Sequence, residues 1–240
     1  MYWRNVATIA RKDITIMMSR RGLRIGIVLL PLALAVGFSQ IVAFAHYPAA
    51  QLPQALNAFL FFFIMYTGAM PANIASYSLV GEKIERSLEP LLATPANDGE
   101  ILLGKGIAAL LPPLAAMWGG MVTLMAYCDV LTRGTLGGLY FPNWTAAVTM
   151  LGVAPLVAIM GVGFAVLWSA RVSEVRTAQQ LASLVALPMA GIYICILSGA
   201  LTLDLASLGI ICGFLVIVDA GLAFAARAAF GREEILTRWA

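Results

Sequence analysis

The sequence predicts an all-α polytopic membrane protein in which six transmembrane helices follow an N-terminal amphipathic interfacial helix. Composition is the first observation: 61% of the 240 residues are hydrophobic and 11% are charged, against about 45–50% and about 25% in soluble domains. The second is a series of apolar stretches of roughly 20 residues, the length that a helix needs to cross a bilayer. The third is that nearly all Lys and Arg residues fall on alternate connections between these stretches.

Residues 1–24 are expected to form the amphipathic helix. Counted at about 100° per residue, Trp3 and other apolar side chains gather on one side, opposite basic and polar ones, as in a helix that lies in the membrane interface. Asp13 breaks this pattern because it points from the middle of the apolar face. It either reaches a nearby Arg or the headgroup region, or it makes a fixed ionic link to another cytoplasmic element. The candidate residues for such a contact are Arg11, Lys12 and Asp13.

The transmembrane domain is predicted over residues 25–226. Its first apolar run is about 21 residues long, whereas the apolar core of a signal peptide is about 7–15, so we expect this run to be retained as a span. Residues 129–144 form the longest outer loop, and residues 202–204 allow only a tight hairpin. The predicted spans run approximately over 25–45, 55–80, 106–128, 145–169, 181–201 and 205–226.

The distribution of basic residues predicts the orientation. Fourteen of the 15 Lys and Arg residues lie before the first span, in the 81–105 and 170–180 connections, or in the tail 227–240, and Arg133 alone lies on the other side. Since Lys and Arg prefer cytoplasmic flanks, both termini are expected in the cytoplasm. These flanks account for the pI of about 8.9, so no nucleic-acid partner is expected.

The residues that usually build enzyme sites are scattered. His46 and the three cysteines form no metal-binding spacing, so we expect no metal, no catalytic residue and no bound cofactor. Residues 99–105 fit the phosphate-loop pattern G-x-x-x-x-G-K, but Gly106 follows where Ser or Thr is needed, and a polar turn precedes. The chain is therefore not expected to hydrolyse ATP itself.

Asp219 is the one acid well inside a predicted span. It lies about 14 residues beyond the start of the sixth span, which places it roughly 21 Å along the helix axis. An acid inside the membrane is a functional-site hypothesis by default. The alternative is a capped or paired contact between helices, within reach of cytoplasmic water.

The 81–105 connection holds eight charged side chains and is predicted to be a helix–turn–helix elbow. The second span runs on into it with leucines at helical spacing, two prolines stop that helix, and Asn97 with Glu100 forms a capping-box pattern that starts the next one. The elbow candidates are Glu82, Lys83, Glu85, Leu88, Glu89, Leu91, Leu92, Pro95, Glu100 and Lys105.

The stretch "GEKIERSLEPLLATPANDGEILLGKGIAALL" resembles the segment after the second span of ABC-2-type transporter permeases. "IARKDI" at 9–14 resembles the amphipathic N-terminal helix of the same family, and the six-span layout is similar too. Arg86 departs from the family pattern, since many members carry Gly there. The matching elbow residues are Glu82, Lys83, Ser87, Leu88, Glu89, Leu91, Leu92, Thr94, Pro95, Glu100, Gly104 and Lys105.

This resemblance implies a permease subunit of an exporter in a prokaryotic cytoplasmic (inner) membrane. Two permease subunits, identical or homologous, would pair, and two separate ABC ATPase subunits would bind ATP and Mg²⁺ and dock at the elbow. Three alternatives stay open: an ion-coupled secondary carrier that uses Asp219, a polytopic membrane enzyme, and a lipid-linked polysaccharide export permease of the same fold. No cargo class is favoured, because the residues of the spans are apolar and generic.

Overall fold

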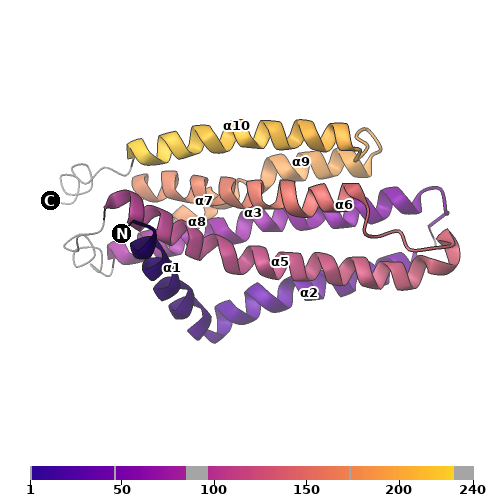
Figure 1. Cartoon of the computed structure of the whole chain (residues 1–240), viewed down its shortest axis with the longest axis horizontal. Helices are drawn as coiled ribbons and strands as arrows, with labels where there is room; N and C mark the ends of the chain where they lie inside the picture. Colours follow the sequence, from indigo (N-terminus) through magenta and orange to yellow (C-terminus); the bar gives the residue numbers. More distant parts are fainter. Residues whose placement is uncertain (1, 46, 85–96, 173, 230–240) are drawn as a thin grey trace.

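The computed structural model describes residues 2–45, 47–84, 97–172 and 174–229, and within these ranges the chain is helical, with no strand. Labels follow Figure 1. The helices are α1 (Tyr2–Ser19), α2 (Arg21–Phe44), α3 (Leu52–Ile84), α5 (Asp98–Leu136), α6 (Trp144–Val148), the π-helix η1 (Thr149–Val153), α7 (Ala154–Arg171), α8 (Val175–Ser183), α9 (Ala186–Leu197) and α10 (Leu205–Ala229).

Six helical segments of the described residues are long and apolar enough to cross a membrane, as the sequence predicts. The helices run along the long axis of the molecule and turn back at its two ends (Figure 1). The chain is thus a multi-pass helical bundle of the membrane type. The six segments are Arg21–Phe44, Leu52–Ser78, Gly99–Leu136, Trp144–Ser169, Val175–Leu197 and Leu205–Ala226.

The third span is longer than predicted. Residues 129–136, assigned to an outer loop by the sequence analysis, continue α5 to Leu136. The reason is that the buried Asp129 carboxylate accepts the N–H groups of Tyr140 and Phe141, at 2.9 and 3.0 Å, from the chain that folds back over it. Gly137, at a φ of 70°, then ends the helix, in the left-handed conformation that favours glycine.

The fifth span is also shifted, from the predicted 181–201 to Val175–Leu197. It consists of α8 and α9, which meet at a turn over Leu184 and Val185. Pro188 lies in the first turn of α9, where its missing N–H costs no helix hydrogen bond. Pro188 therefore lies at the start of a new helix. Pro31 and Pro71, by contrast, lie inside continuous helices.

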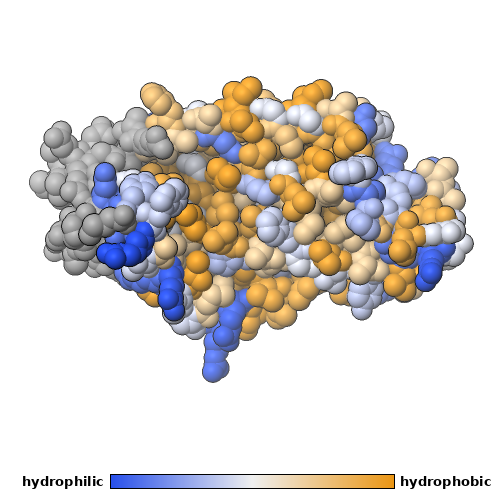
Figure 2. All heavy atoms as spheres, in the orientation of Figure 1, coloured by the Kyte–Doolittle hydropathy of each residue, from blue (hydrophilic) through white to orange (hydrophobic). Residues whose placement is uncertain are grey.

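α3 forms the centre of the bundle and α10 its edge. In the most apolar window of each span, 61% of α3 is buried inside the molecule but only 11% of α10. At the crossing of α3 and α7 the backbones touch, because a Cβ at Gly161 would lie 2.2 Å from the carbonyl oxygen of Gly68. Figure 2 shows apolar residues over much of the middle of the molecule and hydrophilic ones concentrated toward its ends, as a bilayer requires.

Candidate functional site

The candidate site is the junction where α1 lies against the first turns of α5, next to the C-terminal part of α3. Figure 1 shows this junction at the same end of the bundle as the C-terminal end of α10. We call it the α1 junction and define it by Asn5, Asp13, Ser78, Glu100 and Lys105. The elbow segment predicted from the sequence connects the two long helices of this junction.

The first anchor of the junction is the start of α5. Asn97 is the N-cap in an extended conformation, and its N–H donates to the Glu100 carboxylate at 3.0 Å, so the capping interaction predicted for this pair is present. The same carboxylate oxygen accepts the side-chain amide of Asn5 on α1 at 3.1 Å. Glu100 is buried. This predicted elbow residue thus holds α1 rather than standing on an open surface.

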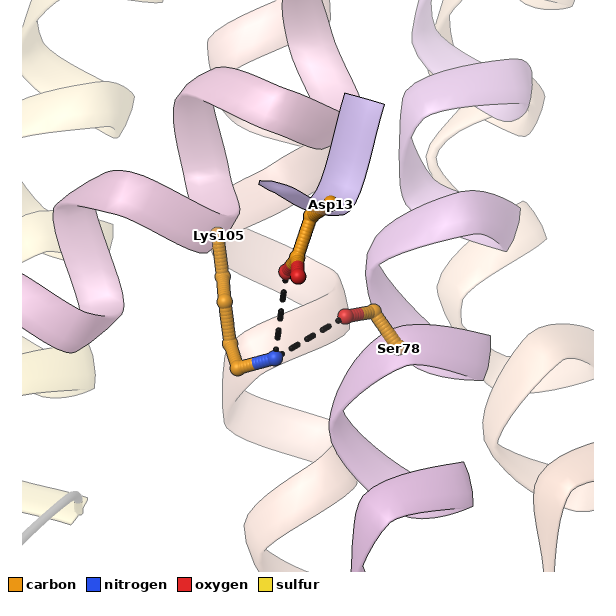
Figure 3. A network of polar contacts seen from close by, with 3 residues as sticks. All are labelled: Asp13, Ser78 and Lys105. Atoms are coloured by element: carbon orange, nitrogen blue, oxygen red, sulfur yellow. Dashed lines mark hydrogen bonds and ion pairs between the residues drawn. The ribbon is translucent and has the colours of Figure 1, made fainter. Parts of the chain in front are cut away.

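The second anchor is an ion pair. The Lys105 ammonium on α5 lies 3.2 Å from the Asp13 carboxylate on α1 and donates to the Ser78 hydroxyl on α3 at 3.3 Å (Figure 3). The Lys105 side chain is 4% exposed and that of Asp13 is 16% exposed. Of the two interpretations of Asp13, the ionic link to another element is the one present. A single side chain therefore joins three helices.

A glycine allows α1 to come this close. Gly104 lies between the two anchors on α5, and a Cβ there would be 2.8 Å from the Cβ of Ile9 and 3.2 Å from the carbonyl oxygen of Val6. No real side chain tolerates the shorter of these distances without a shift of α1. The helix is therefore held at three successive points along its length.

A further contact ties the α1–α2 connection to α3. The Arg20 guanidinium donates to the Tyr77 hydroxyl and lies over the Tyr77 ring, 5.3 Å from its centroid, in a cation–π geometry. Arg11 and Lys12, which the sequence analysis grouped with Asp13 as an ionic contact, are exposed. The ion pair consists of Asp13 and Lys105 instead.

The phosphate-loop pattern at 99–105 is not a phosphate-binding loop. Its residues lie inside helix α5, which begins at Asp98. Gly104 is covered by α1, and the ammonium of Lys105 is paired with Asp13. A phosphate-binding loop needs open backbone N–H groups between a strand and a helix. This segment lies inside a helix and does not follow a strand.

Most of the predicted elbow lies outside the described residues. Glu82 and Lys83 belong to the last turn of α3, and their side chains are outside the described part of the structure. The remaining elbow candidates that lie outside the described residues are Glu85, Leu88, Glu89, Leu91, Leu92 and Pro95.

Asp219 lies on α10, which packs mainly against α7, η1 and α6. Both of its carboxylate oxygens are buried, and neither has a hydrogen-bond partner among the described residues. The alternative for Asp219, a capped or paired contact between helices, is thus not present among the described residues.

Two residues that matter were missed from the sequence. Asn5 was not among the candidates, yet its side-chain amide donates to Glu100. Asp129 was assigned to a loop, yet it is a buried helix residue that holds the 137–143 turn. Nothing local marks either one, since their partners are 95 and 11 residues away. Within the described residues, no group of three His, Cys, Asp or Glu side chains could hold a metal ion.

Neither the comparison with protein-family models nor the comparison with curated proteins finds a match to this chain.

Proposed function

We propose that this chain is the permease subunit of an ABC transporter of the ABC-2 type, an exporter driven by separate ATP-binding subunits that dock at the 81–105 elbow. The observation that carries the proposal is the contact of Lys105 with α1 and α3. It joins three helices at the base of the elbow, so a movement imposed on the elbow reaches all three together.

The lengths of the two flanking helices support this mechanism. α3 has 33 residues and α5 has 39, which at a rise of about 1.5 Å per residue correspond to roughly 50 and 58 Å. Both exceed a hydrocarbon core of about 30 Å. α3 ends inside the elbow and α5 begins inside it. Each is an unbroken helix that would pass a displacement on to its span, with Pro71 in α3 and Pro112 and Pro113 in α5 as the points where it can bend.

The proposed partners come from the family resemblance and from where the charges of the chain lie. ATP and Mg²⁺ would bind to two partner ATPase subunits, as the resemblance implies. The phosphate-loop pattern of this chain lies in a helix whose Gly104 and Lys105 contact α1. The basic residues of α1 and of the α1–α2 connection favour the cytoplasmic side for this end of the bundle. A second permease subunit, identical or homologous, would complete the pathway in a prokaryotic inner membrane.

Co-purification tests the docking. The chain is expressed with any ATPase that is encoded beside it, and Glu82→Arg and Glu89→Arg are compared with Arg133→Glu, a charge reversal at the opposite end of α5. We expect each elbow reversal to release the ATPase while the chain still inserts, and the control to retain it. Full retention of the ATPase by both elbow variants would contradict the proposal.

An ion-coupled carrier is the second candidate, because both oxygens of Asp219 are buried without a partner among the described residues. A carboxylate in that setting is suited to bind a proton or cation during transport. If ATP drives transport, Asp219→Asn leaves ATP-dependent transport by the assembled complex largely intact. If the carrier alternative holds, the same variant abolishes transport that runs on an ion gradient without any ATPase. A lipid-linked polysaccharide permease would share the first outcome and differ in cargo.

A further inference from the structure

A cavity of about 640 Å³ opens beside the α1 junction. Its walls come from α1, Arg20, the first turn of α2, α3, α5 and Gln179 of α8. Pockets of roughly 300–1,000 Å³ are the usual size for small-molecule sites. The cavity is therefore large enough for a polar headgroup together with part of an acyl chain.

The charges on its walls are unequal. Lys12, Arg20 and Lys105 contribute positive charge, and Asp13 is the one acid among the described residues that line it. Because Asp13 is paired with Lys105, the charges of Lys12 and Arg20 are not balanced by a described acid of the cavity wall. Arg20 uses one N–H to reach Tyr77 and has further guanidinium donors available. The walls thus favour an anion near Lys12 and Arg20.

The other walls are apolar. Met17, Ala108 and Ala109 line the cavity and are buried, and Met70 and Ile74 of α3 line it as well. Nearby on α2, Ile25 and Leu29 are 52% and 56% exposed, as side chains that face lipid would be. A ligand with an anionic head and an apolar tail, taken from the surrounding bilayer, fits both kinds of wall.

We propose that this cavity binds an anionic phospholipid, with its phosphate at Lys12 and Arg20 and the upper part of one acyl chain against Met17, Ala108 and Ala109. Basic pockets between membrane helices on the cytoplasmic side are a recurring form of lipid headgroup site. The bound lipid would lie directly against the Lys105 ion pair and stabilise the packing of α1 on α3 and α5. This inference is independent of whether an ATPase drives the chain.

Native mass spectrometry of the purified, delipidated full-length chain tests it. Phosphatidylglycerol and phosphatidylcholine with identical acyl chains are titrated against the wild type, the double variant Lys12→Gln/Arg20→Gln, and the control Arg11→Gln/Arg24→Gln. The control removes the same charge from exposed residues of α1 and α2 that do not line the cavity. Circular dichroism of each variant confirms that its helices are retained.

We expect the wild type and the control to bind phosphatidylglycerol about tenfold or more tighter than phosphatidylcholine, and the cavity variant to lose this preference. Arg20→Lys, which keeps the charge, should retain most of it. Equal loss in the control would mean diffuse attraction to a basic surface and would overturn the site. Competition by glycerol phosphate at the same concentrations as the lipid would also overturn it, since a free phosphate ester would then be the ligand.

Discussion

Lys105 is a buried charge at the α1 junction, with a side chain that is 4% exposed. Removing two charges from water costs several kcal/mol per ion, and the attraction between them repays this only in good geometry. Here the ammonium has a carboxylate at 3.2 Å and a hydroxyl at 3.3 Å. Such a pair adds little net stability compared with apolar residues, but either charge left alone is strongly unfavourable.

A double-mutant cycle at this pair gives the first prediction. Asp13→Asn removes the carboxylate that lies 3.2 Å from the buried Lys105 ammonium. It lowers the free energy of unfolding by about 3 kcal/mol, the lower end for a broken buried pair, because Asp13 is 16% exposed. Asp13→Asn combined with Lys105→Met recovers most of that loss. Thermal unfolding of the chain in detergent measures both. If the two substitutions are simply additive, the pair is not coupled as described.

Asp129 gives the second prediction at the residue scale. Asp129→Ala leaves the N–H groups of Tyr140 and Phe141 without their acceptor, at a cost of about 1–3 kcal/mol. Asp129→Asn keeps an acceptor oxygen and should cost less. Hydrogen exchange at the two amides, measured by mass spectrometry, should rise in the Ala variant and stay close to wild type in the Asn variant. Unchanged protection in Asp129→Ala would refute the role of the carboxylate.

At the scale of the element, α1 is held by close approach as well as by polar contacts. Gly104→Ala places a Cβ 2.8 Å from the Cβ of Ile9, which pushes α1 away at a cost of about 1–3 kcal/mol. Gly119→Ala is the matched control on the same helix, because a Cβ there meets nothing within 4 Å. Hydrogen exchange of the α1 amides should increase in Gly104→Ala and not in Gly119→Ala. Equal protection in both variants would contradict the packing of α1 on α5.

Hydropathy predicts the elements well and their ends less well. Six spans could be found because each contains enough consecutive apolar residues to cross a bilayer, and that signal is local. The end of α5 could not be found in this way. Asp129 is typical of a loop, and only the folded chain shows that its carboxylate accepts the N–H of Tyr140. The break between α8 and α9 was missed for the opposite reason: residues 181–197 contain no charged residue and are mostly apolar, and hydropathy does not register a turn.

The site was predicted in the same uneven way. The capping interaction of Asn97 and Glu100 could be found because its partners are three residues apart. Asp13 could be singled out, since it interrupts an apolar face, but its partner lies 92 residues away. A single sequence does not show that two residues so far apart along the chain are in contact. The elbow residues 85–96 remain a prediction from the family resemblance.

At the scale of the whole molecule, the end that holds the α1 junction is built differently from the centre of the bundle. The end with the α1 junction brings together α1, α3 and α5 through charged and amide side chains. The centre is an apolar core in which α3 and α7 meet backbone to backbone at Gly68 and Gly161. In the proposed mechanism, a push at the first end would reach the far end through this closely packed crossing.

Movement of the far end in response to ATP tests this account most directly. Spin labels are placed at Val130 of α5 and Ile210 of α10, which are 77% and 74% exposed, and the label distance is measured in bilayers by electron paramagnetic resonance. We expect ATP to change the distance only when the ATPase is present, and Asp13→Asn to weaken the change. A distance that ignores ATP in the complex, but shifts when the chain alone experiences an ion gradient, would contradict the account.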